Sequence, residues 1–133
     1  MVFRRFNSYF LFCFVFFFCN SIISQDQRIA DSLLVIYEID TSKGIAKLEL
    51  LYDLSFNEIN NLNLALDYAE ELISLSKSNN SSNYLSFGYF TKGNAKQYSG
   101  ELEDALEAYF KSAEIAKKEN FIHVLGTSYA AIA

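Results

Sequence analysis

The sequence contains no proline and no tryptophan, and it holds only two cysteines and one histidine. Without proline, no residue forces a helix to kink or stop, so long helices are allowed throughout. Both cysteines, Cys13 and Cys19, lie before residue 25, so the remaining chain has no disulfide and no thiolate chemistry. A single histidine, His123, without cysteine partners does not make a typical zinc cluster. Residues 25–133 must therefore be held together by helix packing alone.

The sequence also lacks the common catalytic and nucleotide-binding motifs. No G-x-S-x-G segment accompanies His123, which we interpret as a loop or helix-start residue. Gly88–Gly93 has the glycine spacing of a phosphate-binding loop, but Asn94-Ala95 follows in place of Lys-Ser/Thr. The acidic stretch Glu101–Asp104 is better explained as the solvated first turn of a helix. We expect no catalysis, no cofactor and no metal site within these residues.

Positive charge is scarce as well. The formal net charge is −5, and beyond residue 24 there are 9 Lys and Arg against 16 Asp and Glu. Phosphate contacts from basic side chains supply most of the affinity for nucleic acid, so an acidic chain disfavours this partner. We interpret the negative charge as a contribution to solubility, and we expect no nucleic acid to bind.

Residues 1–24 have the anatomy of a secretory signal peptide. Arg4 and Arg5 form a positive start, Tyr9–Cys19 is an apolar run, and a short polar exit follows. Eight of the 13 phenylalanines lie in this segment. The sequence predicts a signal peptide over residues 1–24, cleaved after Ser21 or Ser24, and hence export to the periplasm or cell envelope.

The alternative for this segment is an uncleaved membrane anchor over residues 6–23. The unbroken apolar run of Tyr9–Cys19 is shorter than the ~20 residues that a spanning helix needs. Counting through Asn20 and Ser21 to Ile23 lengthens the run, so the anchor stays open as a second interpretation.

Apolar residues recur with helical spacing after residue 24, which predicts six helices. We expect them over residues 27–39, 43–57, 62–77, 84–98, 101–119 and 121–133. In the first helix, Ile29, Leu33 and Ile36 form one apolar stripe. Residues 40–42 and 60–61 are expected to cap the helices that follow them. The polar run of residues 76–83 is expected to be a loop.

Part of this pattern repeats farther along the chain. Residues 65–69 align with residues 105–109, and Tyr89 recurs as Tyr129 at the same separation. A tight turn is expected at Ser99-Gly100, between two helices of one repeat. A fixed period of about 40 residues is typical of a solenoid of helix pairs.

These residues resemble the tetratricopeptide repeat family, most strongly over residues 93–117. The positions that match its packing signature are Ala65, Leu72, Tyr89, Gly93, Gly100, Ala105, Tyr109 and Ser112. The chain departs from the pattern at Asp53, where a small residue is expected, and at Lys117, where the family has proline. The resemblance implies an all-α, right-handed solenoid of antiparallel helix pairs over residues 25–133. It would hold about two repeats, a leading helix and an incomplete third repeat.

The resemblance also implies a protein or peptide ligand on a concave face lined by the first helix of each pair. The candidate residues for that face are Leu50, Leu54, Phe87, Phe90, Asn94, Gln97 and Tyr98. Phe90 and Tyr98 would anchor apolar groups, and the two amides would hydrogen-bond a peptide backbone. The alternative is that Leu54, Phe87 and Phe90 simply fill the core between helices.

The layout is similar to bacterial proteins in which a signal peptide precedes a tetratricopeptide array, a membrane helix and a kinase, cyclase or regulator domain. We therefore expect the extracytoplasmic input region of a signalling protein, truncated at Ala133 because a solenoid needs a polar cap. Membrane contact is expected only through the N-terminal segment or a missing C-terminal part. Two alternatives stay open: a stand-alone exported scaffold that self-associates through its uncapped ends, and an enzyme whose catalytic domain lies beyond Ala133.

Overall fold

The computed structural model describes residues 25–39 and 41–133, and these residues form helices and turns without a strand. The predicted all-α class is thereby confirmed. The helices are α2 (Gln27–Ile39), α3 (Ile45–Asn57), α4 (Leu62–Ser78), α5 (Ser82–Tyr98), α6 (Leu102–Lys118) and α7 (Ile122–Ile132). Their bounds differ from the expected ones by a few residues at most. The predicted signal peptide over residues 1–24 lies outside the described residues.

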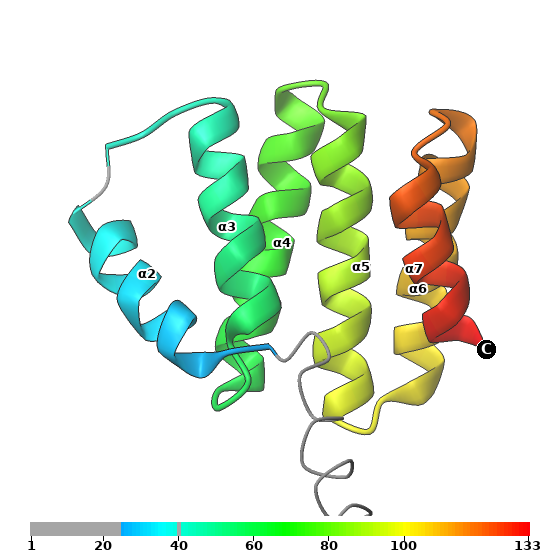
Figure 1. Ribbon diagram of the computed structural model, residues 1–133, viewed down its shortest axis with the longest axis horizontal. Coiled ribbons are helices and arrows are strands. Elements are labelled where there is room, and N and C mark those ends of the chain that lie inside the picture. The colour runs from blue at the N-terminus through cyan, green and yellow to red at the C-terminus, as the bar shows by residue number, and fades with distance from the viewer. Residues whose placement is uncertain (1–24, 40) are drawn as a thin grey trace, which may run out of the picture.

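Each helix packs against the next one along the chain, and the helices form a row with α2 and α7 at opposite ends (Figure 1). Helices that are not consecutive also meet: α3 contacts α5, and α5 contacts α7. The backbones of α4 and α6, by contrast, do not come close to each other. The described helices therefore form two layers, with α3, α5 and α7 in one layer and α4 and α6 in the other. This arrangement leaves α3 and α5 with a common surface that faces away from α4 and α6.

The turns after α4, α5 and α6 are built in the same way and recur at equal intervals along the chain. Each contains one residue with positive φ: Asn80 at 53°, Gly100 at 80° and Asn120 at 60°. Glycine and asparagine tolerate this left-handed conformation better than other residues. The turns close with bonds of one type: Ser81 N to Ser76 O at 2.9 Å, Glu101 N to Lys96 O at 2.9 Å and Phe121 N to Ala116 O at 2.8 Å. The tight turn expected at Ser99-Gly100 is confirmed.

Two expectations about helix ends are wrong. The run of residues 76–83 is not a loop, because α4 continues to Ser78 and α5 already begins at Ser82. Serine is only a moderately poor helix former, and Ser76 is buried against neighbouring helices. The N-cap position of α3 is held by Gly44 at φ 65°, without a side-chain cap, and not by Thr41 or Ser42; Asp40 lies outside the described residues. The cap at Asn61 is confirmed, since its Oδ1 accepts from the backbone of Leu64 at 3.1 Å.

The apolar stripe expected along α2 is partly buried only at Leu33, which packs against the apolar core cluster. Ile29 and Ile36 are 46% and 49% exposed, and the buried residue of this helix is Ala30. The rotation of α2 is fixed by polar contacts at its two ends. Gln27 Oε1 accepts from the backbone of Ile59 at 2.8 Å, and the Tyr37 hydroxyl donates to Glu71 Oε2 at 2.7 Å.

An apolar core cluster lies where α3 and α4 meet, with residues of α2 packed against it. Its buried members are Leu48, Leu50, Leu51, Leu54, Tyr68 and Leu72. Farther along the row the helices meet through smaller groups, including Ala105 and Ala108. Buried hydroxyls bridge the same region: Ser112 Oγ donates to the carbonyl of Ser86 at 2.8 Å and lies 2.9 Å from Ser128 Oγ. Small side chains let the helix backbones approach closely, which holds neighbouring helices at a fixed spacing.

Candidate functional site

A groove of about 690 Å³ opens beside the C-terminal ends of α3 and α5. We name it the aromatic groove, and its lining residues are Gln25, Phe56, Ile59, Leu62, Phe90, Asn94 and Tyr98. They come from the chain before α2, the end of α3, the following turn, the start of α4 and the second half of α5. Ligand sites in proteins are mostly concave and apolar with a few polar groups, as this one is.

Three of the seven residues expected on the concave face line this groove: Phe90, Asn94 and Tyr98. Tyr98 is 59% exposed, so its ring is available to a partner. Gln97 is exposed on the same turn of α5 but does not line the groove. Phe87 lies outside the groove, with its ring stacked on Tyr52 at 4.6 Å between centroids.

The two remaining candidates, Leu50 and Leu54, belong to the buried cluster and offer no surface to a partner. Their assignment to the concave face is therefore wrong, and for Leu54 the alternative of core filling is correct. Leu50 and Leu54 lie on the side of α3 that packs against α4 and α2. Because α3 is apolar on more than one side, the spacing of its leucines did not reveal which side stays open.

Four residues that complete the groove were not predicted from the sequence: Gln25, Phe56, Ile59 and Leu62. The available signal was local: Phe56 and Ile59 are large apolar residues on either side of the expected end of a helix. Ile59 is 41% exposed in the turn that follows α3. A contiguous apolar patch marks a contact surface, whereas a single exposed apolar side chain is common, so Ile59 alone was a weak signal.

A line of four aromatic rings leads from the groove along α3 and α5, and we name it the aromatic ladder. The ring centroids of Tyr84 and Phe87 are 6.0 Å apart, those of Phe87 and Tyr52 are 4.6 Å apart, and those of Tyr52 and Phe56 are 5.9 Å apart. Aromatic pairs in this distance range stabilise each other. The ladder therefore gives α3 and α5 a firm common surface that ends in the groove at Phe56.

Tyr109 of α6 contacts two residues that line the groove, Phe90 and Asn94. Its ring lies 5.8 Å from that of Phe90, and its hydroxyl lies 2.8 Å from both Asn94 Oδ1 and Gln97 Oε1. The hydroxyl has one proton, so it donates to one amide oxygen at a time. The Asn94 amide nitrogen has no partner among the described residues. Asn94 is thus oriented by Tyr109 while it keeps donors for a ligand carbonyl.

Burial raises the pKa of Tyr109 to about 12, with a smaller contribution from Tyr98. The folded protein thus holds this proton more firmly than the unfolded chain, whose tyrosines titrate near 10. The resulting stability is fully present below pH ~10 and is lost as the pH rises toward ~12, by about 2 to 3 kcal/mol for this residue. We expect urea midpoints measured over this pH interval to fall less steeply in Tyr109→Phe. If the urea midpoints of both proteins fall equally steeply with pH, the raised pKa of Tyr109 is contradicted.

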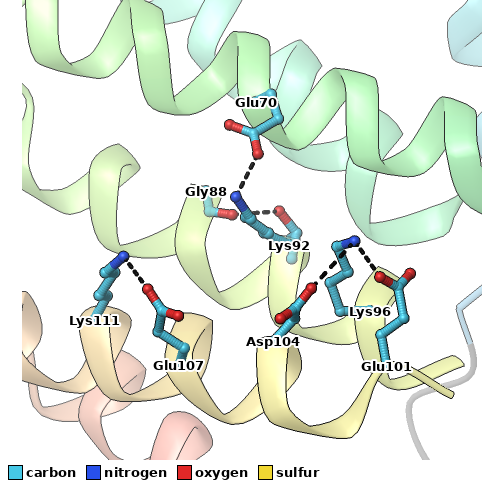
Figure 2. Close-up of polar contacts among 9 residues, drawn as sticks. Glu70, Gly88, Lys92, Lys96, Glu101, Asp104, Glu107 and Lys111 are labelled. Carbon is cyan, nitrogen blue, oxygen red and sulfur yellow. Dashed lines mark hydrogen bonds and ion pairs between the residues drawn. The ribbon is translucent and has the colours of Figure 1, made fainter. Parts of the chain in front are cut away.

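A second cavity of about 310 Å³ lies between α4, α5 and α6, and we name it the charged cleft (Figure 2). Its lysines already have acidic partners. Lys92 pairs with Glu70 on α4, and Lys111 pairs with Glu107 within α6. Lys96 Nζ lies 2.6 Å from Glu101 Oε2 and 3.6 Å from Asp104 Oδ2. Each of these three lysines thus has an acidic partner. We therefore interpret the charged cleft as a set of contacts that stabilise the packing of the helices, and not as a ligand site.

Other kinds of site have no support within the part of the chain that the structure describes. No group of three or more His, Cys, Asp or Glu side chains in residues 25–39 and 41–133 is placed to hold a metal ion. None of the described helices has the length and apolar character needed to cross a membrane. His123 lies in the first turn of α7, in agreement with its expected place at the start of a helix.

No protein-family model, curated protein or solved structure matches this chain. The geometry of the aromatic groove and the chemistry of its lining are therefore the basis for a function.

Proposed function

We propose that this chain is a tetratricopeptide-like, right-handed helical repeat module that binds a protein or peptide segment in the aromatic groove. The observation that carries the proposal is the groove itself, which brings Phe90, Asn94 and Tyr98 together with Phe56 and Ile59. Aromatic and aliphatic side chains around one oriented amide suit an apolar side chain attached to a peptide backbone. The order of helices, with α3, α5 and α7 in one layer, supports the repeat architecture.

The binding mode follows from the lining of the groove. An apolar side chain of the partner would fill the space between Phe56, Phe90 and Tyr98, where burying its surface is favourable by about 25 cal/mol per Å². The Asn94 amide nitrogen would donate to a backbone carbonyl beside that side chain. Buried aromatic contacts of this kind usually contribute most of the affinity of an interface.

The test begins with a random peptide library panned on the full chain, followed by calorimetry with the selected peptides. We expect Tyr98→Ala to weaken binding roughly 10- to 30-fold, since truncating an aromatic anchor typically costs about 2 kcal/mol. Tyr98 is largely exposed, so the variant should keep its fold, which circular dichroism checks.

The matched control is Tyr129→Ala on α7, because Tyr129 is 50% exposed but does not line the groove. This control should leave the affinity unchanged. Failure to select any peptide, or equal losses in both variants, would reject the aromatic groove as a binding site.

A further inference from the structure

Two carboxylates on α3 lie beside the aromatic ladder, one helical turn apart. Glu49 and Asp53 form no hydrogen bond or ion pair through their side chains with the described residues. Like charges at this i,i+4 spacing destabilise a helix. Asp53 is also half-buried, so its charge is less well solvated than that of an ordinary surface carboxylate. A positive group placed between them would relieve both costs.

The two carboxylates act on the rings of the ladder. The pKa of Tyr84 is raised by burial first, and then by the negative charges of Glu49 and Asp53. The pKa of Tyr52 is raised by burial and by Asp53, and that of Asp53 is raised by burial and by Glu49. These groups therefore share one electrostatic environment, which is negative.

The lysines of α3 and α5 are engaged elsewhere. Lys92 and Lys96 of α5 point into the charged cleft and are paired there (Figure 2). Lys47 of α3 lies over the ring of Tyr37 on α2, 3.9 Å from its centroid. The surface formed by the ladder and the two carboxylates is thus both aromatic and acidic, which is the combination that recognises a lysine or arginine side chain.

We propose that the partner segment carries a lysine or arginine close to its apolar anchor, held by Glu49, Asp53 and the rings of Tyr52 and Tyr84. This inference rests on the proposed function, because the anchor itself occupies the aromatic groove. It adds the chemical class of the ligand: a basic, apolar peptide segment and not an acidic one.

Helix geometry fixes the spacing within the ligand. Along α3, Asp53 and Glu49 precede the groove residue Phe56 by about 5 to 10 Å at a rise of 1.5 Å per residue. An extended peptide covers that distance in about two to three residues. The basic residue should therefore lie about two or three positions from the apolar anchor.

The experiment uses the same random peptide library, panned on the full chain, with sequencing of the selected pool. We expect lysine and arginine to be enriched at that spacing from an apolar residue. For one selected peptide, Asp53→Asn should weaken binding about fivefold, and Glu49→Gln combined with it about tenfold. Raising the salt from about 0.1 M to about 1 M should weaken binding to the parent chain more than to the double variant.

The matched control is Asp67→Asn, which removes the same charge from an exposed position on α4. It should change the affinity less than twofold. Selected peptides without a basic preference, or equal effects of Asp53→Asn and Asp67→Asn, would overturn the inference and leave peptide binding standing. A pool with no binding peptides would overturn both proposals, and a Tyr98→Ala loss without any effect at Asp53 would overturn the inference alone.

Discussion

Gly93→Ala is expected to destabilise the protein by about 2 kcal/mol through overpacking, although alanine is the better helix former. A Cβ atom at Gly93 would lie 2.5 Å from both Cδ1 and Cε1 of the Tyr109 ring. That ring is buried and its hydroxyl is held at Asn94 and Gln97, so it cannot move aside freely. Overpacking costs about 1 to 3 kcal/mol, and contacts as short as 2.5 Å place this site at the upper end, which exceeds the ~1 kcal/mol that alanine contributes in a helix by about 2 kcal/mol. Urea denaturation measures the change.

Gly126→Ala is the matched control for this prediction. Gly126 also lies within a helix, but no heavy atom would come within 4 Å of an added Cβ. The same substitution should therefore stabilise the protein by about 0.5 to 1 kcal/mol through helix propensity alone. If Gly93→Ala proves stabilising by a similar amount, Tyr109 is not packed against α5 as described.

Glu58→Ala is expected to destabilise the protein by about 2 to 3 kcal/mol, because one carboxylate serves three donors. Its Oε1 accepts from the backbone of Asn60 at 3.1 Å and of Asn61 at 2.8 Å. Its Oε2 accepts from Gln27 Nε2 at 3.0 Å, which ties α2 to the start of α4. Glu58 is only 8% exposed, so water replaces these contacts poorly once the carboxylate is removed.

Hydrogen exchange separates this role from a general loss of stability. Amides of α2 should lose protection in Glu58→Ala before those of α5 and α6 do, because Gln27 loses its acceptor there. Glu58→Gln keeps an acceptor oxygen and should recover most of the stability. Glu103→Ala, at an exposed position on α6, should change little. Uniform loss of protection along the chain would contradict the proposed attachment of α2.

Much of the helix layout was accessible from the sequence because its signals are local. Gly100 predicts a left-handed turn residue, and the repeat pattern predicts the buried Ala105 and Tyr109 of α6, although Leu102 and Leu106 on the same helix are exposed. The buried state of Ser76 was not accessible, since serine is small enough to fit between helices and polar enough to suggest a loop. Whether such a serine is buried in a helix or exposed in a loop depends on the neighbouring helices, and the local sequence carries no information about them.

The orientation of α2 and α3 was misjudged for a related reason. Both helices carry large apolar residues on several sides, so periodicity alone does not select the buried side. Tertiary contacts decide it: Gln27 and Tyr37 set the rotation of α2 and thereby expose Ile29. For the candidate site the same limit applies. The amide and aromatic residues of α5 were found, but Ile59 entered the groove only through the path of the chain after α3.

The three equivalent turns at Asn80, Gly100 and Asn120 also define segments by which the chain could be lengthened or shortened. A segment that starts just after one of these residues and ends at another begins and ends with the same backbone conformation. Duplicating or deleting residues 81–120 would therefore join compatible ends, whereas a cut within a helix would rotate every later side chain by about 100° per residue. Gains and losses of whole helix pairs should thus be the changes in length that this chain tolerates best.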